Sequence, residues 1–128
     1  MKILINLTLT SLLLILVTSC EEDLDTTTVI GKWKLIETLS DPGDGSGEYE
    51  KYEGNQIATI YSDSSVVFIE GFCFSQGGVD GKEAIVKVNT IYWPDCNLTY
   101  VYELKEEYLF FYPPCIEPCG LKFEKIAD

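Results

Sequence analysis

The sequence predicts an all-β protein, an eight-stranded antiparallel up-and-down barrel. Short runs of β-branched and aromatic residues recur between clusters of Gly, Pro, Asp and Asn, which is the pattern of strands joined by turns. No stretch after the N-terminal apolar segment shows a sustained helical period with caps. The connections between the runs alternate between long and tight. This alternation is expected when strands run up and down a barrel, because every second connection then lies at the same end.

Eight runs supply the strands. The first is GKWKLIETL at 31–39, and a long Gly- and Asp-rich loop separates it from QIATIY at 56–61. The other strands are expected at 65–74, 83–86, 90–93, 98–104, 108–112 and 121–126. The split of residues 83–93 into two strands decides the count. If they form one strand, seven strands remain and the alternation of loops is lost.

The N-terminal residues predict an exported lipoprotein. Lys2 precedes an apolar run at 3–17 that is shorter than the roughly 20 residues of a membrane-spanning helix. The run ends in VTSC, which resembles the bacterial lipobox, at which the cysteine is lipidated and the preceding residues are removed. We expect a signal peptide at 1–19 and acyl chains such as palmitate on Cys20. The alternative is a short membrane anchor that stays attached.

The residues after Cys20 are acidic and then Thr-rich, which predicts a flexible tether at 20–29 ahead of a barrel domain at 30–127. The acidic cluster resembles the surface-export signal of Bacteroidetes-type lipoproteins, and the alternative is a solvated spacer. We expect an outer-membrane lipoprotein, on the periplasmic face or the cell surface, held by its lipid anchor to the bacterial membrane.

Composition excludes several classes of function. The formal net charge of −12 disfavours contact with a polyanion, so nucleic acid is excluded as a partner. The chain has no histidine, so a Ser or Cys nucleophile would lack its usual base, and we expect no enzyme. A Gly-rich loop has the oxygen ligands that Ca²⁺ prefers, but their spacing is not that of an EF-hand. These ligands are Asp41, Asp44, Glu48 and Glu50. We predict no metal site and no cofactor.

Four cysteines remain after Cys20, and an even set in an oxidising compartment predicts two disulfides. In the eight-strand threading all four lie at the same end of the barrel. We expect the pairs Cys115–Cys119, within one proline-rich loop, and Cys73–Cys96, across the mouth. The alternative joins Cys96 to one member of the loop pair and Cys73 to the other.

Three motifs in order carry a family resemblance. GKW at 31–33, DPGDGSG at 41–47, and CIEPC at 115–119 followed by KFEKI resemble the small lipocalin-like lipoproteins of Bacteroidetes. The resemblance implies a lipocalin-like barrel with the Gly-x-Trp motif at Gly31 and Trp33. Trp33 would close the barrel floor beneath a basic residue of the last strand, Lys122 or Lys125, through a cation–π contact. It also implies a small hydrophobic ligand at the open end, and we expect a monomer.

Aromatic residues are the candidate ligand-lining groups. In a small barrel they either fill the interior or leave an apolar cavity with tyrosine hydroxyls as polar groups. A filled interior favours a different function, a protein-interaction or structural module at the cell surface. The candidates are Phe68, Phe72, Tyr100, Tyr102, Phe110 and Tyr112.

Overall fold

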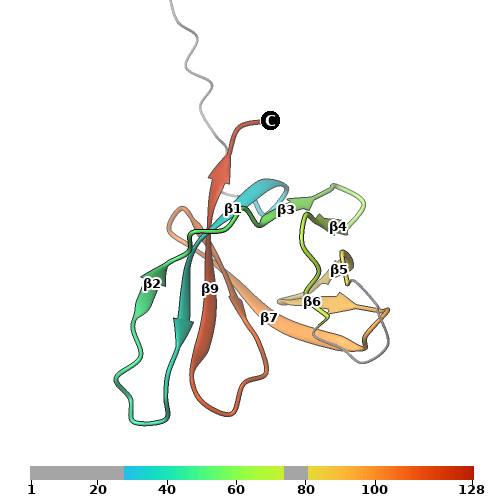
Figure 1. Cartoon of the computed structure of the whole chain (residues 1–128). Coiled ribbons are helices and arrows are strands. Elements are labelled where there is room, and N and C mark those ends of the chain that lie inside the picture. Colours follow the sequence, from blue (N-terminus) through green and yellow to red (C-terminus); the bar gives the residue numbers. More distant parts are fainter. Residues whose placement is uncertain (1–27, 74–80) are drawn as a thin grey trace, which may run out of the picture.

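The computed structural model describes residues 28–73 and 81–128, and all regular structure in this part is β (Figure 1). No helix that could span a membrane occurs among these residues. The predicted signal peptide, Cys20 and most of the predicted tether lie outside the described residues. The strands are β1 (Gly31–Ser40), β2 (Tyr49–Lys51), β3 (Ile57–Ile60), β4 (Ser65–Phe68), β5 (Glu83–Lys87), β6 (Thr90–Trp93), β7 (Leu98–Lys105), β8 (Tyr108–Tyr112) and β9 (Cys119–Ile126).

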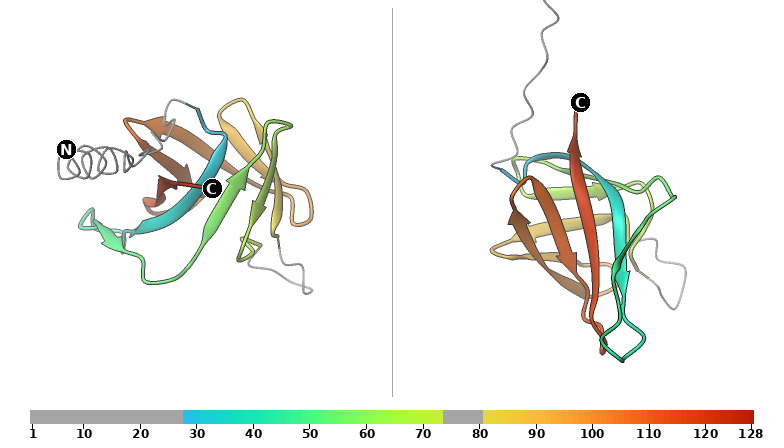
Figure 2. Two further views of the ribbon diagram at one scale, coloured as in Figure 1. Left: turned by 90° about the horizontal axis from the view of Figure 1, so that it is seen from above. Right: turned by 90° about the vertical axis from the view of Figure 1, so that its left-hand side faces the viewer.

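The strands form a closed eight-stranded antiparallel barrel, as the sequence predicts. Strands β3 to β9 pair with their neighbours in chain order, and β1 joins β3 on one side and β9 on the other. Viewed along its axis, the sheet closes into a ring (Figure 2). The short strand β2 lies outside this ring and pairs with the second half of β1. The pairing of β1 with β9 has a register shift between Leu35 and Glu37, a β-bulge at the level where the other edge of β1 passes from β3 to β2.

The connections fall at two ends, as their lengths predict. The segments 41–56, 69–82, 94–97 and 113–118 join strands at one end, here called the open end. The tight turns at 61–64, 88–89 and 106–107 join them at the other, here called the closed end. In Figure 1 the loops from β1 to β2 and from β8 to β9 point downward, and the C-terminus lies at the opposite end. The predicted split of residues 83–93 is confirmed, because β5 and β6 pair across a two-residue turn.

The barrel interior is a packed core of aromatic and aliphatic side chains. Buried residues alternate with less buried ones along β3, β6 and β8, and the core residues come from every wall of the barrel. Close packing of such large side chains supplies most of the stability of so small a domain. The largest fully buried side chains are Trp33, Trp93, Phe68, Phe111, Phe123, Ile91, Leu109 and Val66.

Two strand boundaries differ from the sequence-based prediction. The predicted loop at 40–55 contains β2, and the strand predicted at 65–74 ends at Phe68. The buried side chain of Gln56 explains the early end. Its Nε2 donates to Glu70 O at 2.7 Å and its Oε1 accepts from Glu70 N at 2.9 Å. A side-chain amide therefore takes the place of a neighbouring strand, and the chain leaves the sheet there.

Candidate functional site: an apolar pocket at the open end

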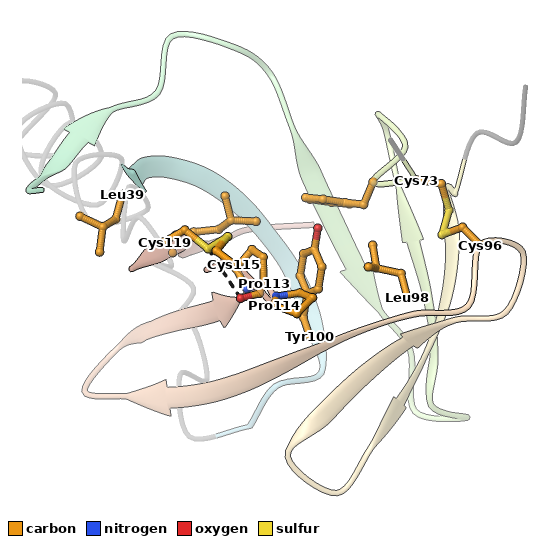
Figure 3. A pocket seen from close by; sticks show the side chains of 12 residues that line it. Leu39, Cys73, Cys96, Leu98, Tyr100, Pro113, Pro114, Cys115 and Cys119 are labelled. Atoms are coloured by element: carbon orange, nitrogen blue, oxygen red, sulfur yellow. Dashed lines mark hydrogen bonds between the residues drawn. A yellow bond between two sulfur atoms is a disulfide. The ribbon is translucent and has the colours of Figure 1, made fainter. Parts of the chain in front are cut away.

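A pocket of about 420 Å³ opens between the loops of the open end (Figure 3). Its volume falls in the range of roughly 300–1,000 Å³ that is typical of small-molecule sites. Its walls come from the ends of β1, β7, β9 and the segments that follow β4, β6 and β8. The lining residues are Leu39, Phe72, Cys73, Cys96, Leu98, Tyr100, Pro113, Pro114, Cys115, Cys119, Gly120 and Leu121.

Both disulfides lie in the wall of this pocket. The predicted pairs Cys73–Cys96 and Cys115–Cys119 are confirmed, with Cα–Cα distances of 5.8 Å and 6.1 Å. Figure 3 shows them on opposite sides of the pocket. The first joins the segment after β4 to the connection between β6 and β7. The second closes the proline-rich loop, in which Cys119 Sγ lies 3.6 Å from the carbonyl oxygen of Pro113. The pocket wall is therefore covalently fixed on two sides.

Gly81 allows the first disulfide to sit where it does. The φ of Gly81 is +58°, and a Cβ at this position would lie 2.2 Å from Cys73 Sγ. Only glycine permits so close an approach. The carbonyl oxygen of Gly81 also accepts a hydrogen bond from Phe72 N at 3.2 Å, which ties Gly81 to the residue before Cys73. Phe72, beyond the end of β4, is buried.

Tyr100 supplies the polar side-chain group of the pocket. Its ring packs against Trp93 at 4.7 Å and Phe72 at 6.0 Å between centroids, and the residue is only 3% exposed. Figure 3 shows Tyr100 between the two disulfides. Burial raises the pKa of its phenol above the ordinary value, so the hydroxyl stays protonated at neutral pH. The hydroxyl has no hydrogen-bond partner among the described residues.

The other candidate ligand-lining residues do not line this pocket, although Phe72 and Tyr100 do. Phe68 is fully buried in the core beside Phe72. Tyr102 lies nearer the closed end, where its N–H donates to Asn89 O. Phe110 and Tyr112 are on the outer face of β8, because strand alternation turns their neighbours inward. These four residues therefore lie outside the open-end pocket.

Phe110 and Tyr112 of β8 make their contacts on the outer surface of the barrel. The Phe110 ring packs edge-on against Tyr49 of β2, with 6.0 Å between centroids. Tyr112 Oη donates to Glu103 Oε2 at 3.3 Å. Both side chains thus take part in the packing of the outer barrel surface, away from the pocket.

The Gly-x-Trp motif lies at the closed end. Trp33 is fully buried, its Nε1 donates to Val29 O at 2.8 Å, and Lys125 Nζ lies 5.2 Å from the ring centroid. A Cβ at Gly31 would lie 2.8 Å from Lys125 Cε, so the glycine makes room for the lysine. Of the two lysines that the resemblance implies, Lys125 occupies the position over Trp33.

Lys122 has different partners. Its Nζ bonds Glu37 Oε2 at 3.0 Å and lies 4.4 Å from the ring centroid of Tyr108. The hydrogen bond to Glu37 raises the pKa of the lysine. This group belongs to the outer surface of the barrel wall and has no part in the floor motif.

The acidic loop after β1 is ordered around Asp41. The carboxylate of Asp41 accepts hydrogen bonds from the backbone N–H groups of Gly43, Gly45 and Gly47 at 2.6 Å, 3.1 Å and 2.7 Å. The bond from Gly47, followed by that from Gly43, lowers the pKa of this carboxyl. Within residues 28–73 and 81–128, no group of three or more His, Cys, Asp or Glu is placed to hold a metal ion. Asp41, the buried acidic residue of this loop, therefore has a structural role, because it accepts hydrogen bonds from the loop backbone.

Comparisons of this chain with protein-family models, with curated proteins and with solved structures find no match.

Proposed function

We propose that this protein binds a small, mostly apolar molecule in the pocket at the open end of its lipocalin-like barrel, without catalysis. The observation that supports the proposal is the pocket lining, in which two disulfides, two prolines, three leucines and aromatic rings surround one tyrosine hydroxyl. Small-molecule sites are commonly of this kind, apolar with a few polar groups that orient the ligand. A wall fixed by covalent bonds also reduces the entropy lost when a ligand binds.

The ligand would lie at the rim of the barrel and not deep inside it. Phe68, Trp93 and Phe111 are fully buried and occupy the interior. Phe72 and Tyr100 separate this core from the pocket, since both contact Trp93 and both line the pocket. The molecule bound would therefore remain partly exposed, and a short chain or a ring fits better than a long lipid.

The packed interior also favours the second candidate function, a cell-surface module that contacts proteins through its open-end loops. The two functions differ in what the pocket does. In the first, the pocket holds a ligand. In the second, the pocket has no role and binding depends on the outer residues of the loops.

Filling the pocket separates the two candidates. Leu98→Trp places a large ring in the pocket, and Thr99→Trp places the same ring on the outer face of the same strand. We expect native mass spectrometry after mild extraction to show a co-purified small molecule on the wild type and on Thr99→Trp, and none on Leu98→Trp. If the wild-type protein carries no small molecule and binds none of a panel of apolar compounds, the first function is refuted.

The same proposal includes anchoring. We propose that residues 1–19 are a signal peptide, that Cys20 is lipidated, and that the protein is an outer-membrane lipoprotein related to the small lipocalin-like lipoproteins of Bacteroidetes. VTSC before the acidic residues at 21–23 is the feature that supports this. Cys20→Ala should abolish labelling by radioactive palmitate and release the protein from the membrane fraction. A Cys20→Ala protein that still sediments with membranes would refute the anchor.

A further inference from the structure

The pocket offers a ligand one hydrogen-bonding side chain. Tyr100 is only 3% exposed. Its hydroxyl lies in the wall of the pocket and has no hydrogen-bond partner among the described residues. A phenol hydroxyl can donate one hydrogen bond and accept others. The hydroxyl is accessible from the pocket, so a ligand group that donates to it or accepts from it replaces water there and is held in one orientation. The neighbouring Trp93 Nε1 is fully buried without a partner among the described residues, but Trp93 does not line the pocket.

From this geometry we infer that the ligand is an uncharged amphiphile, an apolar chain or ring that carries a single hydroxyl, carbonyl or amide group facing Tyr100. The inference rests on the proposed binding function and narrows it to one class of ligand. Three features of the open end support this ligand class: the single hydroxyl, the lack of ionised groups in the described lining, and the charge of the surrounding loops.

A charged head group would find no counter-ion in the pocket. None of the described lining residues has an ionisable acidic or basic side chain apart from Tyr100, whose phenol is held in the neutral form. Moving a carboxylate or an ammonium from water into such surroundings is strongly unfavourable unless an opposite charge pairs with it. An uncharged head group loses much less hydration and recovers it through the Tyr100 hydroxyl.

The loops around the mouth add a second bias, against anions. In the described parts of these loops carboxylates far outnumber lysines, of which there are two, Lys51 and Lys82. Like charges at this range repel, and the repulsion is screened by salt. The negative charge of the loops leaves the binding of an alcohol unaffected and weakens the binding of a carboxylate. For an ammonium it partly offsets the cost of desolvation. The acidic residues are Asp41, Asp44, Glu48, Glu50, Glu53, Glu70, Asp95 and Glu117.

A matched ligand series tests the inference on the wild-type protein. Decan-1-ol, decylamine and decanoate share one apolar chain and differ in the charge of the head group at neutral pH. We expect calorimetric titration, below the micelle concentration of each compound, to rank the alcohol first, the amine second and the carboxylate last. The alcohol should bind at least about tenfold more tightly than the carboxylate, a difference of about 1.4 kcal/mol. Added salt should narrow the gap between amine and carboxylate.

Two variants assign the effects to their residues. Tyr100→Phe should lower the affinity for decan-1-ol by about fivefold, the usual effect of one lost hydrogen bond. Tyr112→Phe, which removes an equivalent hydroxyl from the outer face of β8, is the matched control and should leave all three affinities unchanged. A variant that carries both Asp95→Asn and Glu117→Gln should bind decanoate about two- to threefold more tightly and should leave the affinity for the alcohol unchanged.

The outcomes distinguish the inference from the proposed function. If decanoate or decylamine binds as tightly as the alcohol, the ligand class is overturned while a binding pocket remains. If Tyr100→Phe binds the alcohol like the wild type, the role of the hydroxyl is overturned, and the inference with it. If none of the three compounds binds, and Leu98→Trp behaves like the wild type, the proposed function itself is refuted.

Discussion

The closed end of the barrel depends on Trp33, and replacing it provides the most direct test of how the fold is stabilised. Trp33 is fully buried in the core, and its indole N–H donates to Val29 O at 2.8 Å. Trp33→Ala should lower the free energy of unfolding by about 3–5 kcal/mol through the lost packing and the cavity left behind. The lost hydrogen bond is expected to bring the total toward the upper end of that range, since it contributes about 1 kcal/mol.

A double-mutant cycle isolates the contribution of the lysine above the ring. Lys125 Nζ lies 5.2 Å from the Trp33 ring centroid and also donates to Thr28 O at 3.0 Å. Lys125→Met alone removes both interactions. A cycle of the wild type, Lys125→Met, Trp33→Leu and the double variant isolates the coupling energy between the lysine and the indole ring. We expect this coupling to be about 0.5–2 kcal/mol.

Urea unfolding followed by far-UV circular dichroism, with both disulfides kept intact, measures these differences. Lys105→Met is the matched control, because Lys105 is exposed on β7, and it should leave the free energy of unfolding within about 0.5 kcal/mol of the wild type. A loss below about 1 kcal/mol for Trp33→Ala would contradict the role of Trp33 as a buried closure of the barrel, given the range expected for such residues.

Two further predictions concern the open end. Replacing Cys73 and Cys96 by serine should cost about 3 kcal/mol, and replacing Cys115 and Cys119 about 2 kcal/mol, because the first bridge spans 23 residues and the second 4; equal losses in thermal unfolding would argue against this order. Asp41→Asn should destabilise the protein at neutral pH and flatten its stability at acid pH. The folded-state pKa of Asp41 is lowered, so its contribution is present above the unfolded carboxyl pKa and is lost as the pH falls through the folded one. Unchanged acid unfolding in this variant would refute the prediction.

The alternation of loop lengths carried most of the correct fold prediction. It required eight strands, placed every cysteine of the domain at one end and so predicted which pairs could form. The decisive step was the split at 88–89, where Asn89 has a φ of 58° that suits a tight turn. Local sequence was sufficient here because turns and strand alternation are local properties.

The structure differs from the local pattern where tertiary contacts override it. Aromatic content made Phe110 and Tyr112 candidates for ligand lining, and alternation from the buried Leu109 places them on the outer face of β8. The strand β2 has no β-branched residue and forms because Tyr49 packs on Phe110. The end of β4 depends on Gln56, which lies in a separate connection. None of these contacts can be seen from a single stretch of sequence.

The chain enters and leaves the barrel on the same side. Thr28 accepts from Lys125 at the closed end, and Lys32 pairs with Asp128 there at 3.4 Å. Any polypeptide or lipid joined through either end would therefore connect to the barrel at its closed end, opposite the mouth. A molecule arriving from solution would reach the pocket without crossing the attachment surface. For the same reason, a reporter domain or a sensor chip coupled through Asp128 would leave the mouth free for binding measurements.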